Sequence, residues 1–126
     1  MKSITSAITS VGGYVPETVL TNFDLEKMVD TNNEWIISRT GIKERRILKD
    51  KSLGTSFMAI NAANKLLQEK DVDPTSIDLV IVSTATPDMP VSSTASFVAT
   101  EIGASNAFGY DIQGACSGFL LSLIHI

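Results

Sequence analysis

An uninterrupted run of four strongly apolar residues, Leu79–Val82, constrains the fold of this chain most. A run that is short, β-branched and free of polar residues is typical of a strand buried on both faces of a parallel sheet. Residues 55–70 before it and residues 93–102 after it carry apolar side chains at helical spacing. We expect a second strand at residues 107–112 and a further helix from Ser117. Strands that alternate with helices predict an α/β fold.

The N-terminal part of the chain carries the signals of one strand and two short helices. Residues 4–11 alternate loosely in polarity, which favours a strand. In the second helix, Thr31 is followed three residues later by Glu34, which is the pattern of a capping box. Trp35 and Arg39 lie four residues apart in this helix and therefore share one of its faces.

Charge and composition argue against several classes of protein. Acidic residues outnumber basic ones by 14 to 10, which disfavours a generally basic nucleic-acid binder. A transmembrane helix needs about 20 apolar residues, so we expect no membrane span, and Ser and Thr interrupt residues 1–10 too often for a secretory signal. The single cysteine, Cys116, excludes an intrachain disulfide and a multi-cysteine metal site. We therefore expect a cytoplasmic protein without a metal site.

One basic cluster stands out in this acidic chain. Residues 43–51 contain five of the ten lysines and arginines. A solvated hairpin or loop is the simplest interpretation of such a cluster. The alternative is a local site for an anionic ligand.

Cys116 is the strongest candidate for chemistry. It follows the expected strand at residues 107–112 directly, precedes a helix, and is flanked two residues away on each side by Gly114 and Gly118. A helix N-terminus stabilises a thiolate, and N–H groups there can hold an oxyanion. An inert buried cysteine is the structural alternative. The spacing also resembles the nucleophile elbow of α/β-hydrolases, so it does not by itself separate an acyltransferase from a hydrolase.

Four stretches of the sequence, taken together with their order and separations, are highly specific. They are residues 13–17 (GYVPE), residues 25–31 (LEKMVDT), residues 34–42 (EWI with RTGI) and residues 114–119 (GACSGF). They resemble the N-terminal part of β-ketoacyl-acyl-carrier-protein synthase III, the initiating condensing enzyme of type II fatty-acid synthesis. The resemblance extends over nearly the whole chain, up to about residue 120.

The resemblance implies a fold and an activity. The fold would be thiolase-like, with the chain as an incomplete N-terminal half that has a mixed, mostly parallel sheet and flanking helices, and the intact protein would be a homodimer. Cys116 would take an acyl group from acyl-CoA, and the thioester would condense with malonyl-acyl-carrier protein with loss of carbon dioxide. Acyl-CoA would be a substrate, and no cofactor is expected.

The resemblance also assigns binding residues. Trp35 and Arg39, with Thr31 beside them, would hold the adenine end of coenzyme A; a plain cation–π pair on the surface is the alternative. Residues 85–92 would reach across the dimer, and Val91 would lie near the wall of the partner's acyl pocket. We expect the basic cluster to lie near coenzyme A phosphates or the acidic carrier protein.

The C-terminal part departs from the family. Members of the family run to more than twice this length, and their second half supplies the histidine and asparagine for decarboxylation. We expect residues 1–126 to form one truncated domain in which an apolar tail replaces the helix after the cysteine and residues 121–126 are non-native. Two other functions remain open: an inactive coenzyme A-binding fragment, and a cysteine hydrolase, which would need an Asp and a His after the nucleophile.

His125 is the only histidine in the chain. It lies nine residues after Cys116, which is about 13 Å along a continuous helix at a rise of about 1.5 Å per residue. Because a catalytic pair requires hydrogen-bond distance, we expect no catalytic role for His125.

Overall fold

The computed structural model describes residues 7–126, and the chain divides into two compact units. The larger unit comprises Leu53–Ile126 together with the N-terminal residues up to Tyr14. The smaller unit is Val15–Ser52. Within residues 7–126, no helix is long and apolar enough to cross a membrane.

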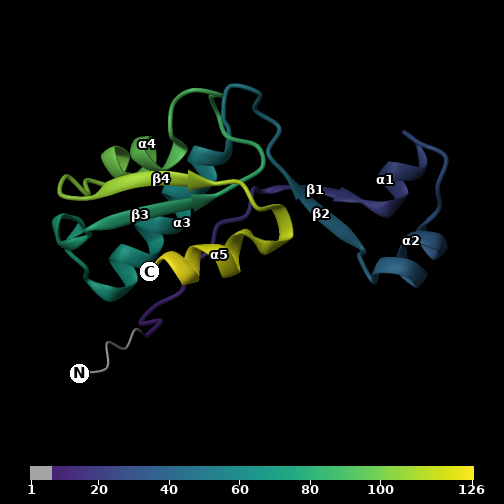
Figure 1. Ribbon diagram of the computed structural model, residues 1–126. Helices are drawn as coiled ribbons and strands as arrows, with labels where there is room; N and C mark the ends of the chain where they lie inside the picture. The colour runs from purple at the N-terminus through teal and green to yellow at the C-terminus, as the bar shows by residue number, and fades with distance from the viewer. Residues whose placement is uncertain (1–6) are drawn as a thin grey trace. The chain divides into compact units, whose positions relative to one another are not determined.

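A two-stranded parallel sheet forms the centre of the larger unit (Figure 1). Strand β3 (Leu79–Ser83) pairs with β4 (Phe108–Ile112), and α4 (Thr94–Glu101) connects them. Helix α4 packs on both strands, and α3 (Thr55–Lys70) packs on α4. After β4, the 3₁₀ turn η2 (Ala115–Ser117) leads into α5, and an earlier 3₁₀ turn, η1 (Pro74–Ser76), precedes β3.

Helices α4 and α5 (Gly118–His125) cover opposite faces of the sheet (Figure 1). Gly109 of β4 faces α4, where an added Cβ would lie 2.9 Å from the carbonyl carbon of Ala95. The next residue, Tyr110, packs its ring edge-on against His125 of α5 at 5.9 Å between centroids. Successive strand residues point to opposite faces, so α4 and α5 sandwich β4. The core of the larger unit consists of Leu67, Ala95, Val98, Ala99 and Ala104.

The smaller unit is an antiparallel strand pair with two short helices. Strand β1 (Thr18–Thr21) pairs with β2 (Glu44–Ile47). Helix α1 (Asn22–Glu26) follows β1, and α2 (Asn33–Thr40) leads to β2. Strand β2 contains Arg45 and Arg46 of the basic cluster, so the cluster lies on a strand and its flanks.

The sequence predicted the larger unit well. The helices expected at residues 55–70 and 93–102 are α3 and α4, and the expected strands are β3 and β4, paired in parallel. Strand β3 is half-buried rather than fully buried, because within the described residues it pairs with β4 alone.

Three local expectations were wrong. The strand expected at residues 4–11 lies partly outside the described residues, and residues 7–11 form no strand. Thr31 does not cap α2: Asn32 is the N-cap, and its side-chain oxygen accepts a hydrogen bond from the Trp35 N–H at 2.8 Å. The apolar C-terminal residues do not interrupt the helix after Cys116, because α5 continues to His125.

Candidate functional site

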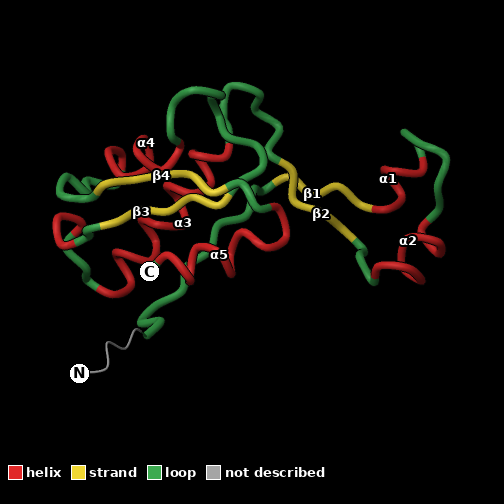
Figure 2. The backbone as a smooth tube through the Cα atoms, in the orientation of Figure 1, coloured by secondary structure: helices red, strands yellow, loops and turns green. Residues whose placement is uncertain are grey.

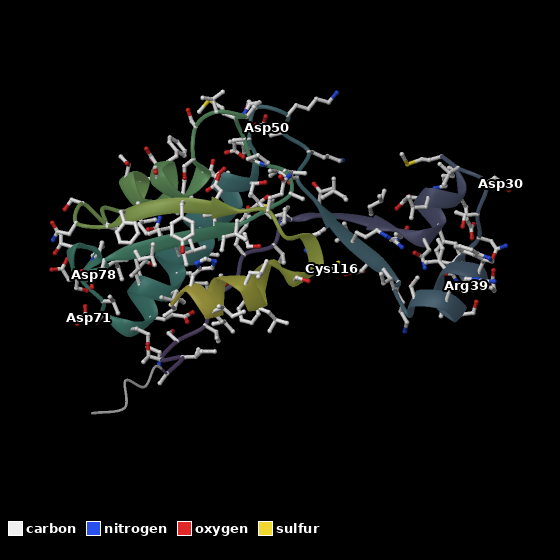
Figure 3. The ribbon with its side chains drawn as sticks, viewed as in Figure 1. Asp30, Arg39, Asp50, Asp71, Asp78 and Cys116 are labelled. Carbon is white, nitrogen blue, oxygen red and sulfur yellow. The ribbon has the colours of Figure 1, made fainter. Side chains whose placement is uncertain are left out.

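Cys116 lies in the turn between β4 and α5 and is exposed (Figure 3). The residue before it, Ala115, has a φ of +43°, in the left-handed region that non-glycine residues rarely adopt. Strained backbone of this kind persists where surrounding structure holds it, and it clusters at functional sites. The thiol is therefore presented on a strained turn, which disagrees with the interpretation of Cys116 as a buried inert residue.

The two glycines around the cysteine serve close packing rather than an unusual backbone conformation. Gly114 and Gly118 have φ values of −131° and −60°. A Cβ on Gly114 would lie 2.7 Å from Leu121 Cδ1, and a Cβ on Gly118 would overlap the Ser83 hydroxyl and lie 3.1 Å from Ser83 Cβ. The absence of side chains at both positions brings α5 against its own turn and against the end of β3.

Two N–H groups next to the thiol are used by the turn itself. The Ser117 N–H donates to the Gly114 carbonyl at 2.9 Å, and the Gly118 N–H donates to the Ala115 carbonyl. These two groups stabilise the turn that presents Cys116. An oxyanion on a bound substrate would need other donors.

Residues 84–92, here called the 84–92 loop, connect β3 to α4 (Figure 2). Val91, near the end of this loop, is 97% exposed. The loop lines a cavity of about 280 Å³, and Asp111 and Gln113, from β4 and the segment before Cys116, line the same cavity. The structure therefore brings Val91 and the approach to the cysteine to one cavity.

Asp111 fixes the end of this loop to β4. Its carboxylate accepts hydrogen bonds from the N–H groups of Thr94 and Ala95, at 2.8 and 2.7 Å, and from the Ser93 hydroxyl at 3.2 Å. Burial raises the pKa of this carboxyl, but the hydrogen bonds from Thr94, Ala95 and Ser93 outweigh it, so the pKa of Asp111 lies below its ordinary value. Sequence reasoning missed this role, although an aspartate inside a strand is itself a signal that it has partners.

The smaller unit brings together the three residues expected to hold coenzyme A. The Arg39 guanidinium carbon lies 5.2 Å from the centroid of the Trp35 ring, as the helical spacing predicted. Trp35 is 54% exposed. Thr31 and Trp35 line one shallow pocket of about 210 Å³, together with Asp30 and Asn32. An exposed indole beside a guanidinium suits the face of an aromatic base.

A buried asparagine, which sequence reasoning missed, is hydrogen-bonded to the start of α2, the helix that carries Trp35 and Arg39. Asn22 is 1% exposed, and its amide nitrogen donates to the Ile42 carbonyl at 2.8 Å and to Asn33 Oδ1 at 3.1 Å. Its amide oxygen accepts a 2.6 Å hydrogen bond from Arg45. Asn22, the first residue of α1, is thus hydrogen-bonded to Asn33 at the start of α2, to Ile42 between α2 and β2, and to Arg45 of β2.

His125 stands apart from the turn in its contacts, since its ring packs against Tyr110. Among the described residues, His, Cys, Asp and Glu side chains nowhere gather in a group of three or more that could hold a metal ion.

Comparison with known proteins agrees with the resemblance in the sequence, although no family model matches the chain. The chain is 54% identical over 120 residues to β-ketoacyl-[acyl-carrier-protein] synthase III of Phocaeicola vulgatus, which covers 95% of this chain and 36% of the relative. It is also 54% identical over 123 residues to the protein of that name from Porphyromonas gingivalis, covering 98% and 37%. The chain spans a little over a third of the length of these curated relatives.

Solved structures give the same result. The 3-oxoacyl-[acyl-carrier-protein] synthase III from Aquifex aeolicus superposes with a TM-score of 0.86 at 46% identity, covering 92% of this chain and 37% of that one. The synthase III from Thermus thermophilus superposes with a TM-score of 0.88 at 42% identity, covering 95% and 37%. The fold is that of an incomplete half of a thiolase-like condensing enzyme. By sequence, the chain is a homologue of β-ketoacyl-[acyl-carrier-protein] synthase III over about a third of that protein.

Proposed function

We propose that this chain is the N-terminal part of a β-ketoacyl-acyl-carrier-protein synthase III, an acyltransferase that condenses a short acyl-CoA with malonyl-acyl-carrier protein. One observation carries the proposal. Cys116 is exposed on a strained turn between β4 and α5, in a chain 54% identical over 95% of its length to proteins of that name.

The proposed chemistry has two steps. The Cys116 thiolate attacks the carbonyl carbon of acyl-CoA, a carbon–sulfur bond forms, and coenzyme A leaves as a thiolate that takes up a proton. Malonyl-acyl-carrier protein then loses carbon dioxide, and the resulting carbanion attacks the thioester and releases Cys116. Acyl-CoA is a substrate in this scheme, and the scheme uses no cofactor.

Coenzyme A binding is assigned to the smaller unit. The adenine would stack on Trp35 beside Arg39, with Thr31 in the wall of the same pocket. The basic cluster at residues 43–51 adds positive charge for phosphates or for the acidic carrier protein. Arg45 keeps its positive charge while it donates to the neutral amide of Asn22, whereas the charge of Arg46 is partly offset by Glu44 at 3.9 Å.

Acyl-chain selection is assigned to the 84–92 loop. In the cytoplasmic homodimer that the family implies, Val91 would face the acyl pocket of the partner. Its full exposure in the single chain supports a role in contact with another molecule. Valine is smaller than an aromatic side chain, so this position does not by itself restrict the pocket to the shortest acyl groups.

Mass spectrometry of the acylated protein tests the proposal. Incubation of the chain with acetyl-CoA should add one acetyl group, and peptide mapping should place it on Cys116. Cys116→Ala should abolish the adduct, whereas Ser117→Ala, a change at the neighbouring nucleophile, should leave it. Acetylation that survives Cys116→Ala would refute the proposal.

A second candidate is binding of coenzyme A without acyl transfer. The pocket at Trp35 favours it, because this pocket lies in the smaller unit and needs no nucleophile. Quenching of the single tryptophan by coenzyme A, combined with no adduct on Cys116, would select this function over acyl transfer. A cysteine hydrolase has less support, because the relatives of this chain are named as synthases.

A further inference from the structure

The 84–92 loop is fastened to the first turn of α3 by two side-chain contacts. The Ser56 N–H donates to both carboxylate oxygens of Asp88, at 3.2 and 3.1 Å. One residue earlier, the Thr55 hydroxyl donates to the Thr86 carbonyl at 2.7 Å. Ser56 is 6% exposed, so the Asp88 carboxylate satisfies an N–H group that is largely removed from water.

Asp88 caps the N-terminus of α3, although it lies far from that helix in the sequence. The N-cap of α3 is Gly54, whose own residue type offers no side chain to accept a hydrogen bond. The first N–H groups of a helix have no partner within the helix, and an aspartate is a favoured acceptor. Asp88 supplies this acceptor from 32 residues further along the chain.

Gly54 provides the space for that carboxylate. Its φ of −132° is ordinary extended backbone, so conformation does not require glycine there. An added Cβ would lie 2.7 Å from Asp88 Cγ and would overlap Oδ1. We call the contact of Asp88 with Gly54 and Ser56 the Asp88 clasp.

The clasp shortens the free part of the loop. The loop is fixed at its start, where the Thr84 N–H donates to the Ile112 carbonyl at 3.1 Å, and just after its end, where Asp111 binds Ser93. Two further anchors lie between these: the Thr86 carbonyl, which is bound by Thr55, and the Asp88 carboxylate. Only residues 89–92 then span from the clasp to the Asp111 anchor, and Val91 is among them. Without Asp88, the last anchor before Ser93 is Thr86, and the free span grows from residues 89–92 to residues 87–92.

From this geometry we propose that Asp88 is a positioning residue for acyl-chain selectivity, acting by holding the 84–92 loop, and with it Val91, in one place. This inference rests on the proposed function. Asp88 itself touches no substrate. Its loss lets the loop move away, so longer acyl groups are accepted alongside short ones.

The test combines two measurements on the full 126-residue chain. Hydrogen exchange reports the clasp directly, and Asp88→Ala should reduce the protection of the Ser56 amide about tenfold. Acylation of Cys116 by acetyl-CoA and by octanoyl-CoA, followed by mass spectrometry, reports selectivity. The rate with acetyl-CoA divided by the rate with octanoyl-CoA should fall at least threefold in Asp88→Ala.

Glycine variants provide a matched control. Gly54→Ala keeps Asp88 but fills its place, so it should change both readouts in the same direction as Asp88→Ala. Gly13→Ala should change neither, because nothing lies within 4 Å of an added Cβ there. Asp88→Asn keeps one acceptor oxygen and should give an intermediate rate ratio.

The outcomes separate this inference from the proposed function. Faster exchange at Ser56 with an unchanged rate ratio would overturn the role in selectivity while leaving acyl transfer intact. The absence of any adduct on wild-type Cys116 would refute acyl transfer and the selectivity role together. An unchanged rate of Ser56 exchange in Asp88→Ala would show that the clasp does not hold the loop, and would overturn the inference at its first step.

Discussion

Replacing Asn22 with alanine should destabilise the smaller unit strongly. The change removes two hydrogen bonds that the amide nitrogen donates, to Ile42 and Asn33, and one that the amide oxygen accepts from Arg45. A neutral hydrogen bond contributes about 0.5–1.5 kcal/mol and one to a charged group about 1.5–3 kcal/mol. The three together amount to about 2.5–6 kcal/mol. Arg45 is only half-buried, so its guanidinium can hydrogen-bond to water once the Asn22 side chain is removed. We therefore expect the free energy of unfolding to fall by about 2–4 kcal/mol.

Urea unfolding followed by the fluorescence of Trp35 measures this loss, because Trp35 is the only tryptophan and lies in the smaller unit. Asn33→Ala removes one neutral partner and should cost about 1 kcal/mol. A double-mutant cycle of Asn22→Ala with Arg45→Ala should give a coupling energy above about 1 kcal/mol. A loss below about 0.5 kcal/mol in Asn22→Ala, with an unchanged denaturant slope, would refute this account of the buried network.

Four further outcomes are expected. Hydrogen bonds hold the pKa of Asp111 below the ordinary 3.8, so Asp111 stabilises the fold above that pH and loses this contribution as the pH falls further. Asp111→Asn should therefore narrow the difference between the urea midpoints at pH 7 and pH 3, and an unchanged difference would contradict this. Trp35→Ala should weaken coenzyme A binding about tenfold in calorimetry, since base stacking contributes about 1–3 kcal/mol, whereas Trp35→Phe retains most of it and Arg39→Ala has a smaller effect. His125→Ala should leave the rate of iodoacetamide labelling of Cys116 unchanged from pH 6 to 9, and a large change would restore a catalytic role. Residues 1–126 alone should form no β-ketoacyl product from acetyl-CoA and malonyl-acyl-carrier protein, because the family's histidine and asparagine are not among them; product at the rate of a full-length relative would disprove this.

The sequence predicted those elements whose pattern is set by burial. Strand β3 carries a continuous apolar run, and α3 carries apolar side chains at helical spacing. Both elements pack on α4, which is why their sequences are apolar. Strand β2 escaped prediction for the opposite reason. Strand β2 reads ERRI and its residues are mostly exposed, so its pairing depends on backbone hydrogen bonds that leave no apolar signature.

The sequence predicted the local setting of the candidate residues but not the contacts that support them. Cys116 is marked by local glycines, and Trp35 with Arg39 by helical spacing. The supports connect residues far apart in the chain: Asp88 with Ser56, and Asn22 with Arg45. No local sequence pattern predicts such pairs, because each partner by itself is an ordinary polar residue. The left-handed backbone at Ala115 was not predicted, because nothing in the local sequence marks an alanine for that conformation.

The close approach of α4 to β4 at Gly109 limits how this protein can diversify over generations. An added Cβ there would lie 2.9 Å from backbone atoms of both Ala95 and Ser96, so any larger residue pushes the helix off the sheet. Asp111 binds the first turn of the same helix, and that displacement would therefore pull on the strand that leads to Cys116. Changes in substrate range must then accumulate where neither contact is disturbed, at the exposed residues around Val91. In a library of random variants selected for acetylation of Cys116, position 109 should stay glycine in every survivor, whereas positions 89–91 should accept substitutions that change the preferred acyl group.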